Sequence, residues 1–379
     1  MWNPQLLYSN YLLHQPNILF GNNSFYGLAD YPCSKVAIFS SSAVDNSTKS
    51  ILEKIFKKKS VYFVERSWKK EPDLEGLKGS ISELEKISPD LIIAIGGGSV
   101  IDGAKLCRLF YEFPYYEVGI TKVSSCSFKT NFIAIPTTLG SGAEISSAAV
   151  YINKNEKCKE MIINPELIPS VIVFNSVFFT HSLNAVDIVK SSLDAICHVI
   201  EGYLSKRKNE LAEILAEKSL SIFFHELSKS DYKYLSFERL QYAGYLGGIV
   251  QNHCIVGVVH SLSHQLSEYG FSHSEAISII LPSVLSLYKT KENIKSKIDS
   301  LCDFAGLLST EHLITFIKEL SSKAELQNRK IQLIDVLSKL IDDEQFITNV
   351  IEDISGSESE ISITKEFISE IFLELKNGL

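Results

Sequence analysis

The chain of 379 residues lacks several features that would assign it to a protein class at once. No apolar stretch reaches about 18 residues, the length that predicts a membrane-spanning helix. The N-terminus shows no basic segment followed by an apolar core, so we predict no signal peptide. The net charge is −8, which argues against nucleic-acid binding, because phosphate affinity depends mainly on clustered Lys and Arg.

Paired cysteine spacing is missing as well. The seven cysteines are odd in number and scattered, without a CxxC motif. This pattern predicts free thiols in a reducing compartment rather than a disulfide framework or a zinc site. We therefore expect a cytoplasmic protein that does not associate with membranes.

The first half of the chain alternates short β-rich runs with helical ones. Hydrophobic residues make up 45% of the chain, and the length favours two domains. Alternating strands and helices predict a parallel sheet covered by helices. The predicted strands lie at residues 36–39, 60–64, 91–95, 132–135 and 170–174.

After about residue 180 the β-rich runs almost vanish and long helical stretches dominate. We predict helices over residues 185–204, 211–228, 237–250 and 254–266. The fold class is therefore an N-terminal Rossmann-like α/β domain, residues 1–180, followed by an all-helical domain, residues 181–379. No linker-like tract separates the two, so a ligand site in a cleft between them is expected.

Two clusters of polar residues in the helical half predict a metal site. Asp194 and His198 are four residues apart, so on a helix their side chains lie on one face. His260 and His273 follow among apolar stretches, where buried imidazoles need partners. One carboxylate and three imidazoles suit Fe(II), Zn(II), Ni(II) or Co(II) better than Mg or Ca. The alternative for the first pair alone is a surface hydrogen bond or a helix cap.

Two loops in the first half are candidate phosphate-binding loops. Gly96, Gly97 and Gly98 follow a predicted strand and precede a helix that begins near Ser99. Glycine allows close approach of the backbone, and the first N–H groups of a helix attract anions. The alternative is a simple strand-to-helix turn, since the spacing is not GxGxxG.

The second loop follows the next predicted strand. After Pro136 it carries the hydroxyls of Thr137 and Thr138, then Gly140, Ser141 and Gly142. Hydroxyl donors at the carboxyl end of a parallel strand suit phosphate and ribose oxygens. The alternative is a Gly/Ser loop without a ligand.

Four motifs together resemble the iron-containing (group III) alcohol dehydrogenase family. The first loop continues with Asp102, Ala104 and Lys105, as the family pattern does, and the second ends in Glu144. Asp194, Ala195, His198 and Glu201 match the family's metal-binding helix. His260, His264 and His273 match its later histidine segment.

The resemblance implies a dinucleotide-binding domain, a helical domain that holds the metal, and hydride transfer between them. It implies metal ligation by Asp194, His198, His260 and His273, with Fe(II) first and Zn(II) as the alternative. His264 stands where the family places a histidine near nicotinamide and substrate, so it is assigned a proton-relay or orienting role. Lys159 aligns with a lysine that contacts the ribose. The cofactor-binding residues implied are Ser41, Gly96, Gly97, Gly98, Ser99, Asp102, Thr137, Thr138, Ser141 and Lys159.

One departure from the family bears on the choice of cofactor. Where relatives that use NAD place an Asp, this chain reads Ser40, Ser41 and Ser42. Without that carboxylate a 2′-phosphate is not repelled, which favours NADPH, although NADH stays open.

The histidine segment resembles the branch that reduces phosphonoacetaldehyde. The predicted reaction is therefore reduction of a small aldehyde, with phosphonate- or phosphate-bearing aldehydes as candidates, to a primary alcohol. The alternatives are a glycerol or polyol dehydrogenase acting on a ketone, a lyase like dehydroquinate synthase, and a non-catalytic scaffold. Relatives lead us to expect a homodimer or larger homo-oligomer.

Overall fold

The computed structural model describes residues 16–21, 23–41, 44–69, 71–118, 127–153, 158–175, 184–229, 232–254, 257–353 and 360–378. Within these residues the chain divides into two compact units, residues 16–184 and residues 185–378. The predicted boundary at residue 180 falls in residues 176–183, outside the described residues.

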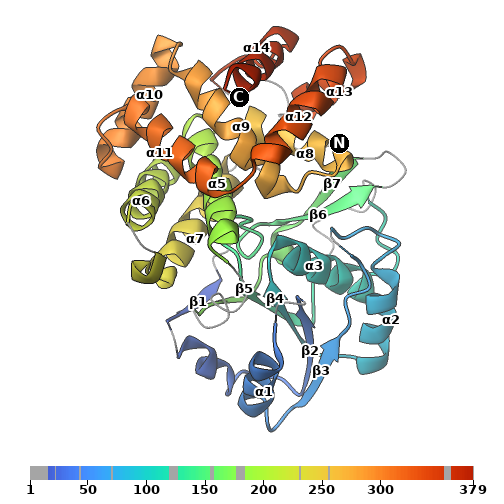
Figure 1. The fold of residues 1–379 in the computed structure, drawn as a ribbon. Coiled ribbons are helices and arrows are strands. Elements are labelled where there is room, and N and C mark those ends of the chain that lie inside the picture. The colour runs from blue at the N-terminus through green and yellow to red at the C-terminus, as the bar shows by residue number, and fades with distance from the viewer. Residues whose placement is uncertain are drawn as a thin grey trace. The chain divides into compact units, whose positions relative to one another are not determined.

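The first unit is built on a six-stranded, entirely parallel sheet with the order β1-β8-β5-β4-β2-β3, and a separate antiparallel pair, β6 and β7. Figure 1 shows these strands together with helices α1 to α3. The elements are β1 (Asn17–Phe20), η2 (Ser24–Leu28), β2 (Lys35–Ser40), α1 (Asn46–Ile55), β3 (Ser60–Val64), α2 (Lys78–Ile87), β4 (Leu91–Gly96), α3 (Gly98–Glu112), β5 (Asn131–Pro136), β6 (Ala148–Asn153), β7 (Cys158–Ile163), η4 (Pro165–Leu167) and β8 (Val171–Phe174).

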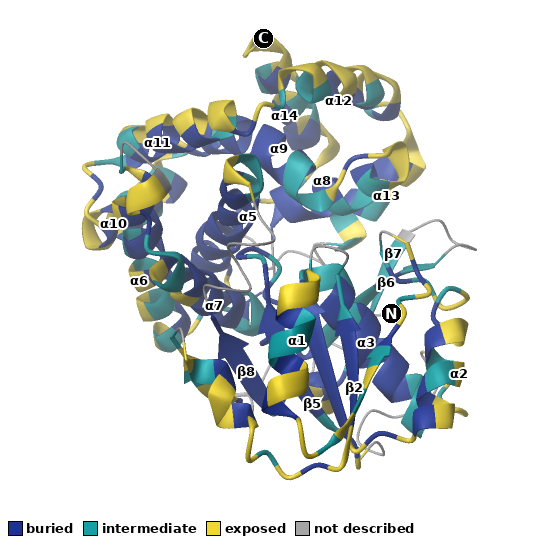
Figure 2. Ribbon diagram, turned by 60° about the horizontal axis from the view of Figure 1, so that its bottom comes forward, coloured by how far each residue is buried: buried dark blue, intermediate teal, exposed yellow. Residues whose placement is uncertain are grey.

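Alternate residues of the central strands face two separate hydrophobic layers. Ile92 and Ala94 of β4 pack in the layer formed with α2 and α3, whereas Ile93 and Ile95 pack in the layer formed with α1 and η2. Because both faces are covered, the strands are apolar throughout, as expected of a parallel sheet. Figure 2 shows β2, β5 and β8 buried and the outer face of α1 exposed.

In the part of the second unit that the structure describes, the regular elements are all helices, joined by turns and loops. Its central helix is α5, which is buried along nearly its whole length (Figure 2). The helices are α5 (Ala185–Tyr203), α6 (Glu210–Leu227), η5 (Tyr232–Tyr234), α7 (Phe237–His253), α8 (Val258–Leu266), η6 (Ser267–Tyr269), α9 (His273–Tyr288), α10 (Glu292–Ala305), α11 (Thr310–Lys323), α12 (Gln327–Leu340), α13 (Glu344–Asp353) and α14 (Lys365–Asn377).

The predicted fold class, a parallel-sheet domain followed by a helical one, is confirmed, and each predicted strand corresponds to a strand of the main sheet. The prediction missed β1, β6 and β7. Strand β1 has only four residues, and β7 begins Cys-Lys-Glu, so neither shows a long apolar or strictly alternating pattern.

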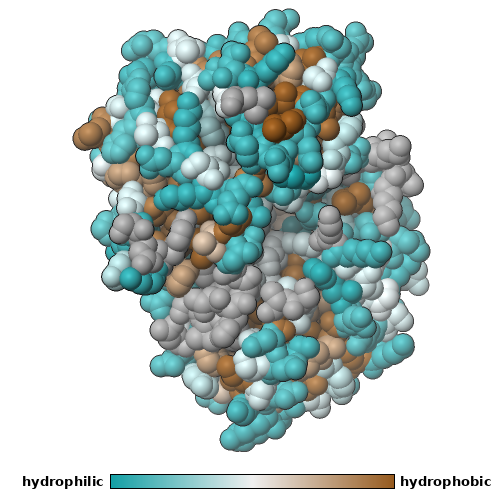
Figure 3. Space-filling model, viewed as in Figure 1, coloured by the Kyte–Doolittle hydropathy of each residue, from teal (hydrophilic) through white to brown (hydrophobic). Residues whose placement is uncertain are grey.

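Among the described residues, no helix is both long and apolar enough to cross a bilayer. On the face drawn in Figure 3, hydrophobic residues are interspersed with hydrophilic ones.

Candidate active site

Helix α5 carries three buried polar side chains on one face. Asp194, His198 and Glu201 are 5%, 1% and 4% exposed, and their spacings of four and three residues place them on successive turns. Buried polar groups need partners. Most of the remaining helix is also buried, with apolar residues such as Leu193 and Val199, so these partners must come from neighbouring helices.

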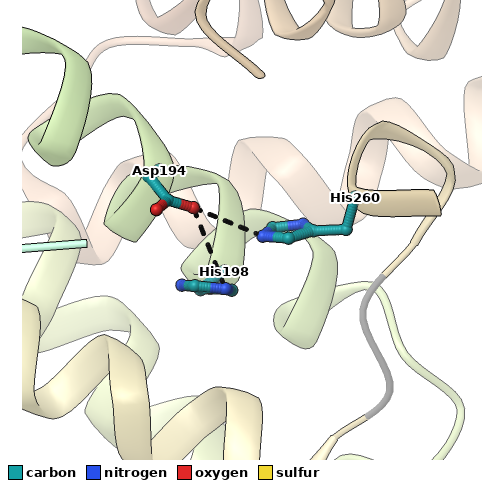
Figure 4. A group of neighbouring side chains, drawn as sticks. All are labelled: Asp194, His198 and His260. Carbon is teal, nitrogen blue, oxygen red and sulfur yellow. Dashed lines mark ion pairs between the residues drawn. The ribbon is translucent and has the colours of Figure 1, made fainter. Parts of the chain in front are cut away.

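Two further histidines approach Asp194 from α8 and α9. The Nε2 atoms of His260 and His273 lie 3.6 and 3.5 Å from Asp194 Oδ1, and Nε2 of His198 lies 4.0 Å from the same oxygen. Figure 4 shows Asp194 and His198 on α5, with His260 reaching towards them. The structure thus brings together all four residues predicted as metal ligands.

Several polar atoms of Asp194, His198 and His260 lack hydrogen bonds. Asp194 Oδ1, His260 Nε2 and both ring nitrogens of His198 are buried without a hydrogen-bond partner. The ligand atoms of Asp194, His198 and His260 all lie within 4.8 Å of one another. Buried polar atoms without a partner are costly, and a divalent cation among them would satisfy several at once. The donor set therefore fits a metal of the kind predicted.

Glu201 fixes the orientation of His260. Its carboxylate accepts hydrogen bonds from His260 Nδ1 at 2.6 Å, Gly257 N at 2.7 Å and Val259 N at 2.8 Å. A carboxylate that only accepts requires the proton on Nδ1, which leaves the lone pair on Nε2 for a metal. The same carboxylate caps the N-terminus of α8, where Gly257 has no side chain to do so.

The close approach of Glu201 also explains the glycine at the start of α8. A Cβ atom on Gly257 would lie 2.7 Å from Glu201 Oε1. Any larger residue there would displace the carboxylate that holds His260.

Ser263 has the corresponding role for His273. Its hydroxyl donates to His260 O at 2.7 Å and lies 2.8 Å from His273 Nδ1. Since its one proton is already engaged, it accepts from Nδ1 and leaves Nε2 of His273 unprotonated. His273 is the first residue of α9, whose N-terminus is fixed by a capping box between Ser272 and Glu275.

The surroundings of Asp194 and His198 favour the protonation states that can bind a metal, which are the ionised carboxylate and the neutral imidazole. Burial raises the pKa of Asp194, but the surrounding His273, His260 and His198 hold it well below its ordinary value. Burial, with His260 nearby, holds the pKa of His198 well below its ordinary value.

His260 differs from His198. Burial lowers its pKa, but Cys197, Asp194 and Glu201 together raise it well above its ordinary value. This imidazole must therefore release a proton before it can bind a metal through Nε2. Metal affinity is accordingly expected to decrease as the pH is lowered.

His264 lies beside the ligand group without belonging to it. Its ring stacks on His273 with a centroid separation of 5.2 Å and an angle of 16°. Its Nδ1 bonds to the Asp353 carboxylate at the end of α13, 2.7 Å away. The predicted proton-relay role of His264 stays a prediction.

The two predicted phosphate loops are neighbours in the first unit, because β4 and β5 pair in parallel and both loops follow their carboxyl ends. A Cβ on Gly97 would lie 3.0 Å from the side chain of Thr138, and one on Gly98 would lie 2.8 Å from Ser141. The start of α3 has no side-chain cap, and the hydroxyl oxygens of Thr138 and Ser141 would lie 3.3 and 3.1 Å from those Cβ positions. Such an arrangement suits a phosphate.

Other predicted cofactor residues lie around these loops. Ser41 follows β2 at the same sheet edge, and its Oγ is buried without a hydrogen-bond partner. Ser99 Oγ accepts from Trp68 Nε1 at 3.4 Å. Thr137 is buried. Lys159 Nζ lies 3.5 Å from Glu71. Ser42 is outside the described residues.

Asp102 is tied to the β6–β7 pair. Its Oδ2 accepts from Val150 N at 3.3 Å, and its Oδ1 lies 3.8 Å from Lys105 Nζ. Lys105 in turn donates to the carbonyls of Ser146 and Ala148. Burial raises the pKa of Asp102 to about 6 and that of Glu144 to about 7, and lowers that of Lys105 to about 8. This buried group joins α3 to the chain that follows the second loop.

Sequence reasoning missed the supporting residues. Glu201 stands in the same motif as His198, so its spacing could have singled it out. Its hydrogen bond to His260, 59 residues away, cannot be inferred from that motif. Ser263 and Asp353 carry no sequence signal, because serines and acidic residues are common on helix surfaces.

Adjacent loops at the carboxyl ends of a parallel sheet, together with a carboxylate–histidine group, are features expected of a nucleotide-dependent metalloenzyme. Family models agree: iron-containing alcohol dehydrogenase matches residues 15–176, and the C-terminal domain model of the Fe-containing alcohol dehydrogenase family matches residues 188–375. The chain belongs to the iron-containing alcohol dehydrogenase family. The prediction of an enzyme of this type is confirmed.

Individual relatives support this placement. The chain is 28% identical to an alcohol dehydrogenase of Thermococcus barophilus over 74% of each chain. It is also 28% identical to the NADPH-dependent butanol dehydrogenase of Clostridium saccharobutylicum over 68% of each chain. Its structure resembles that of the iron-containing alcohol dehydrogenase of Thermococcus thioreducens, with 25% identity, a TM-score of 0.79, and 96% and 99% of the two chains covered.

Proposed function

We propose that the chain is a metal-dependent, NAD(P)H-linked reductase that converts a small aldehyde into a primary alcohol. The observation that carries the proposal is the convergence of three imidazole Nε2 atoms on Asp194 Oδ1, within 3.5 to 4.0 Å. Several of these atoms are buried without a partner. Their number and type match a catalytic metal site better than a structural hydrogen-bond network.

Asp194, His198, His260 and His273 would hold the metal, with Fe(II) as the first candidate and Zn(II) as the second. When bound, the ion would polarise the carbonyl oxygen of the substrate. Glu201 and Ser263 hold two of the imidazoles in the tautomer that presents Nε2. His264, which stacks on His273, is assigned to orient the substrate or pass a proton.

The first unit would bind the dinucleotide, which carries the hydride. Gly96 to Ser99 and the hydroxyls of Thr137, Thr138 and Ser141 are assigned to the phosphates and ribose, with Asp102 and Lys159 nearby. The unpartnered hydroxyl of Ser41 favours NADPH, because it offers a donor and no repelling carboxylate to a 2′-phosphate. The butanol dehydrogenase relative is described as NADPH-dependent, which agrees.

The substrate class rests on the resemblance of the histidine segment to the phosphonoacetaldehyde branch. A small aldehyde that bears phosphonate or phosphate is therefore the first candidate. Assembly as a homo-oligomer and a cytoplasmic location stay predictions.

The test is oxidation of NADPH and NADH with a panel of neutral aldehydes, anionic aldehydes and polyol-derived ketones, with and without a chelator. We expect chelator-sensitive turnover of at least one aldehyde, faster with NADPH. Turnover of ketones alone would favour a polyol dehydrogenase. No turnover of any carbonyl compound by metal-loaded protein would refute the reductase.

A further inference from the structure

We propose that Asp353 is a positioning residue for His264. Its carboxylate sets the tautomer and the ring orientation of this imidazole, and thereby gives the C-terminal helices a part in the reaction. The inference rests on the proposed function and deepens it, because it names the group that prepares His264 to orient the substrate or pass a proton.

The hydrogen bond between the two side chains determines the tautomer. His264 Nδ1 lies 2.7 Å from Asp353 Oδ2, and the side chains are only 17% and 19% exposed. A carboxylate offers acceptors only, so Nδ1 donates and the neutral ring carries its lone pair on Nε2. Nε2 has no hydrogen-bond partner among the described residues, which leaves it available to substrate or solvent.

The ring is held from a second side. It stacks on His273 at 16° between the planes, so rotation about its side-chain bonds would break either the stack or the bond to Asp353. Helix α13 is anchored one turn earlier on α8, where Ser261 Oγ donates to Val350 O. The carboxylate therefore reaches His264 from a fixed helix, and the imidazole is oriented before any ligand binds.

A surface ion pair would show none of these features. Exposed pairs contribute little to stability and tolerate many geometries. Here the carboxylate joins α13 to the imidazole adjacent to the ligand group, although the two residues are 89 positions apart. The arrangement matches the general pattern of a carboxylate behind a catalytic imidazole.

The decisive variant is Asp353→Asn. The asparagine amide can donate to Nδ1 and so favour the wrong tautomer. We expect kcat to fall at least about tenfold, within the range attributed to a positioned acid or base, while the KM for the aldehyde, the Kd for NADPH and the metal content stay unchanged. The ¹⁵N shifts of His264 in the diamagnetic Zn(II)-loaded protein should change from the Nδ1–H to the Nε2–H pattern.

Two controls separate positioning from folding. Glu352→Gln alters the exposed neighbouring carboxylate and should change neither kcat nor the ¹⁵N spectrum of His264. Asp353→Glu keeps a carboxylate acceptor, so it should show a higher kcat than Asp353→Asn and part of the Nδ1–H pattern. Wild-type kcat and an unchanged tautomer in Asp353→Asn would overturn the proposal. So would an equal loss of metal, fold and activity in the Asn and Glu variants. A wild-type protein without turnover would refute the proposed function instead, and the ¹⁵N spectra would still decide the pairing.

Discussion

Replacing Glu201 by Gln tests how the site holds His260. The carboxylate accepts three N–H groups, two on Oε2 and one on Oε1. A Gln side chain has a single acceptor oxygen. With that oxygen in the place of Oε2, the amide NH₂ faces the Val259 N–H, and one buried donor loses its partner.

The expected loss in the free energy of unfolding can be worked out from these contacts. A buried donor left without a partner costs about 1 to 3 kcal/mol, and each bond that changes from a charged to a neutral acceptor loses about 1 kcal/mol. With one orphaned donor and two such bonds, the free energy of unfolding should therefore fall by about 3 to 5 kcal/mol. Because His260 Nδ1 then donates to a neutral amide oxygen in place of a carboxylate, its Nε2 becomes a weaker ligand, and the metal Kd should rise about 10- to 100-fold.

Urea unfolding of the metal-free protein and metal titration by competition with a chelator measure the two effects separately. Glu319→Gln, which alters an exposed glutamate on α11, is the matched control and should change neither. If Glu201→Gln retained both wild-type stability and wild-type metal affinity, our account of how His260 is held would be wrong.

Three further predictions concern the ligands and the cofactor unit. His273→Ala should lower metal content and activity together with unchanged far-UV circular dichroism, because a partly exposed ligand leaves the fold intact; activity that survived complete metal loss would make the metal incidental. Ser41→Asp should raise the Kd for NADPH and spare that for NADH, since a carboxylate repels a 2′-phosphate; fluorescence titration beside Ser41→Ala checks this, and equal effects on both dinucleotides would contradict it. The folded-state pKa of Glu144 is raised from 4.5 to about 7, so its contribution to stability is present below pH 4.5 and is lost as the pH rises through about 7. Glu144→Gln should abolish up to about 3 kcal/mol of this decline, measured by urea unfolding across that range, and an unchanged pH profile would refute it.

The sequence predicts those parts of the molecule that local patterns encode. The apolar runs of β4 and β5 reveal a buried parallel sheet, and the spacing of Asp194 and His198 places both on one helical face. The parts it does not predict depend on tertiary packing. The β6–β7 pair includes polar residues, and the hydrogen bonds that join β6 to Asp102 and Lys105 of α3 appear only in three dimensions.

At the proposed metal site, too, the features that depend on tertiary packing are not encoded in local sequence patterns. A histidine's tautomer depends on what lies behind its ring, and for His264 that group is Asp353, 89 residues away. The grouping of Asp194 with the three histidines could be predicted from their motifs, whereas the hydrogen bonds that orient these side chains could not.

The most direct test of the central claim is anomalous diffraction at the iron and zinc edges from crystals of anaerobically purified protein. We predict one ion bonded to the Asp194 carboxylate and to Nε2 of His198, His260 and His273, at about 2.0 to 2.2 Å. Metal-loaded protein that shows no anomalous peak among these four side chains, or shows its ion elsewhere, would contradict the account.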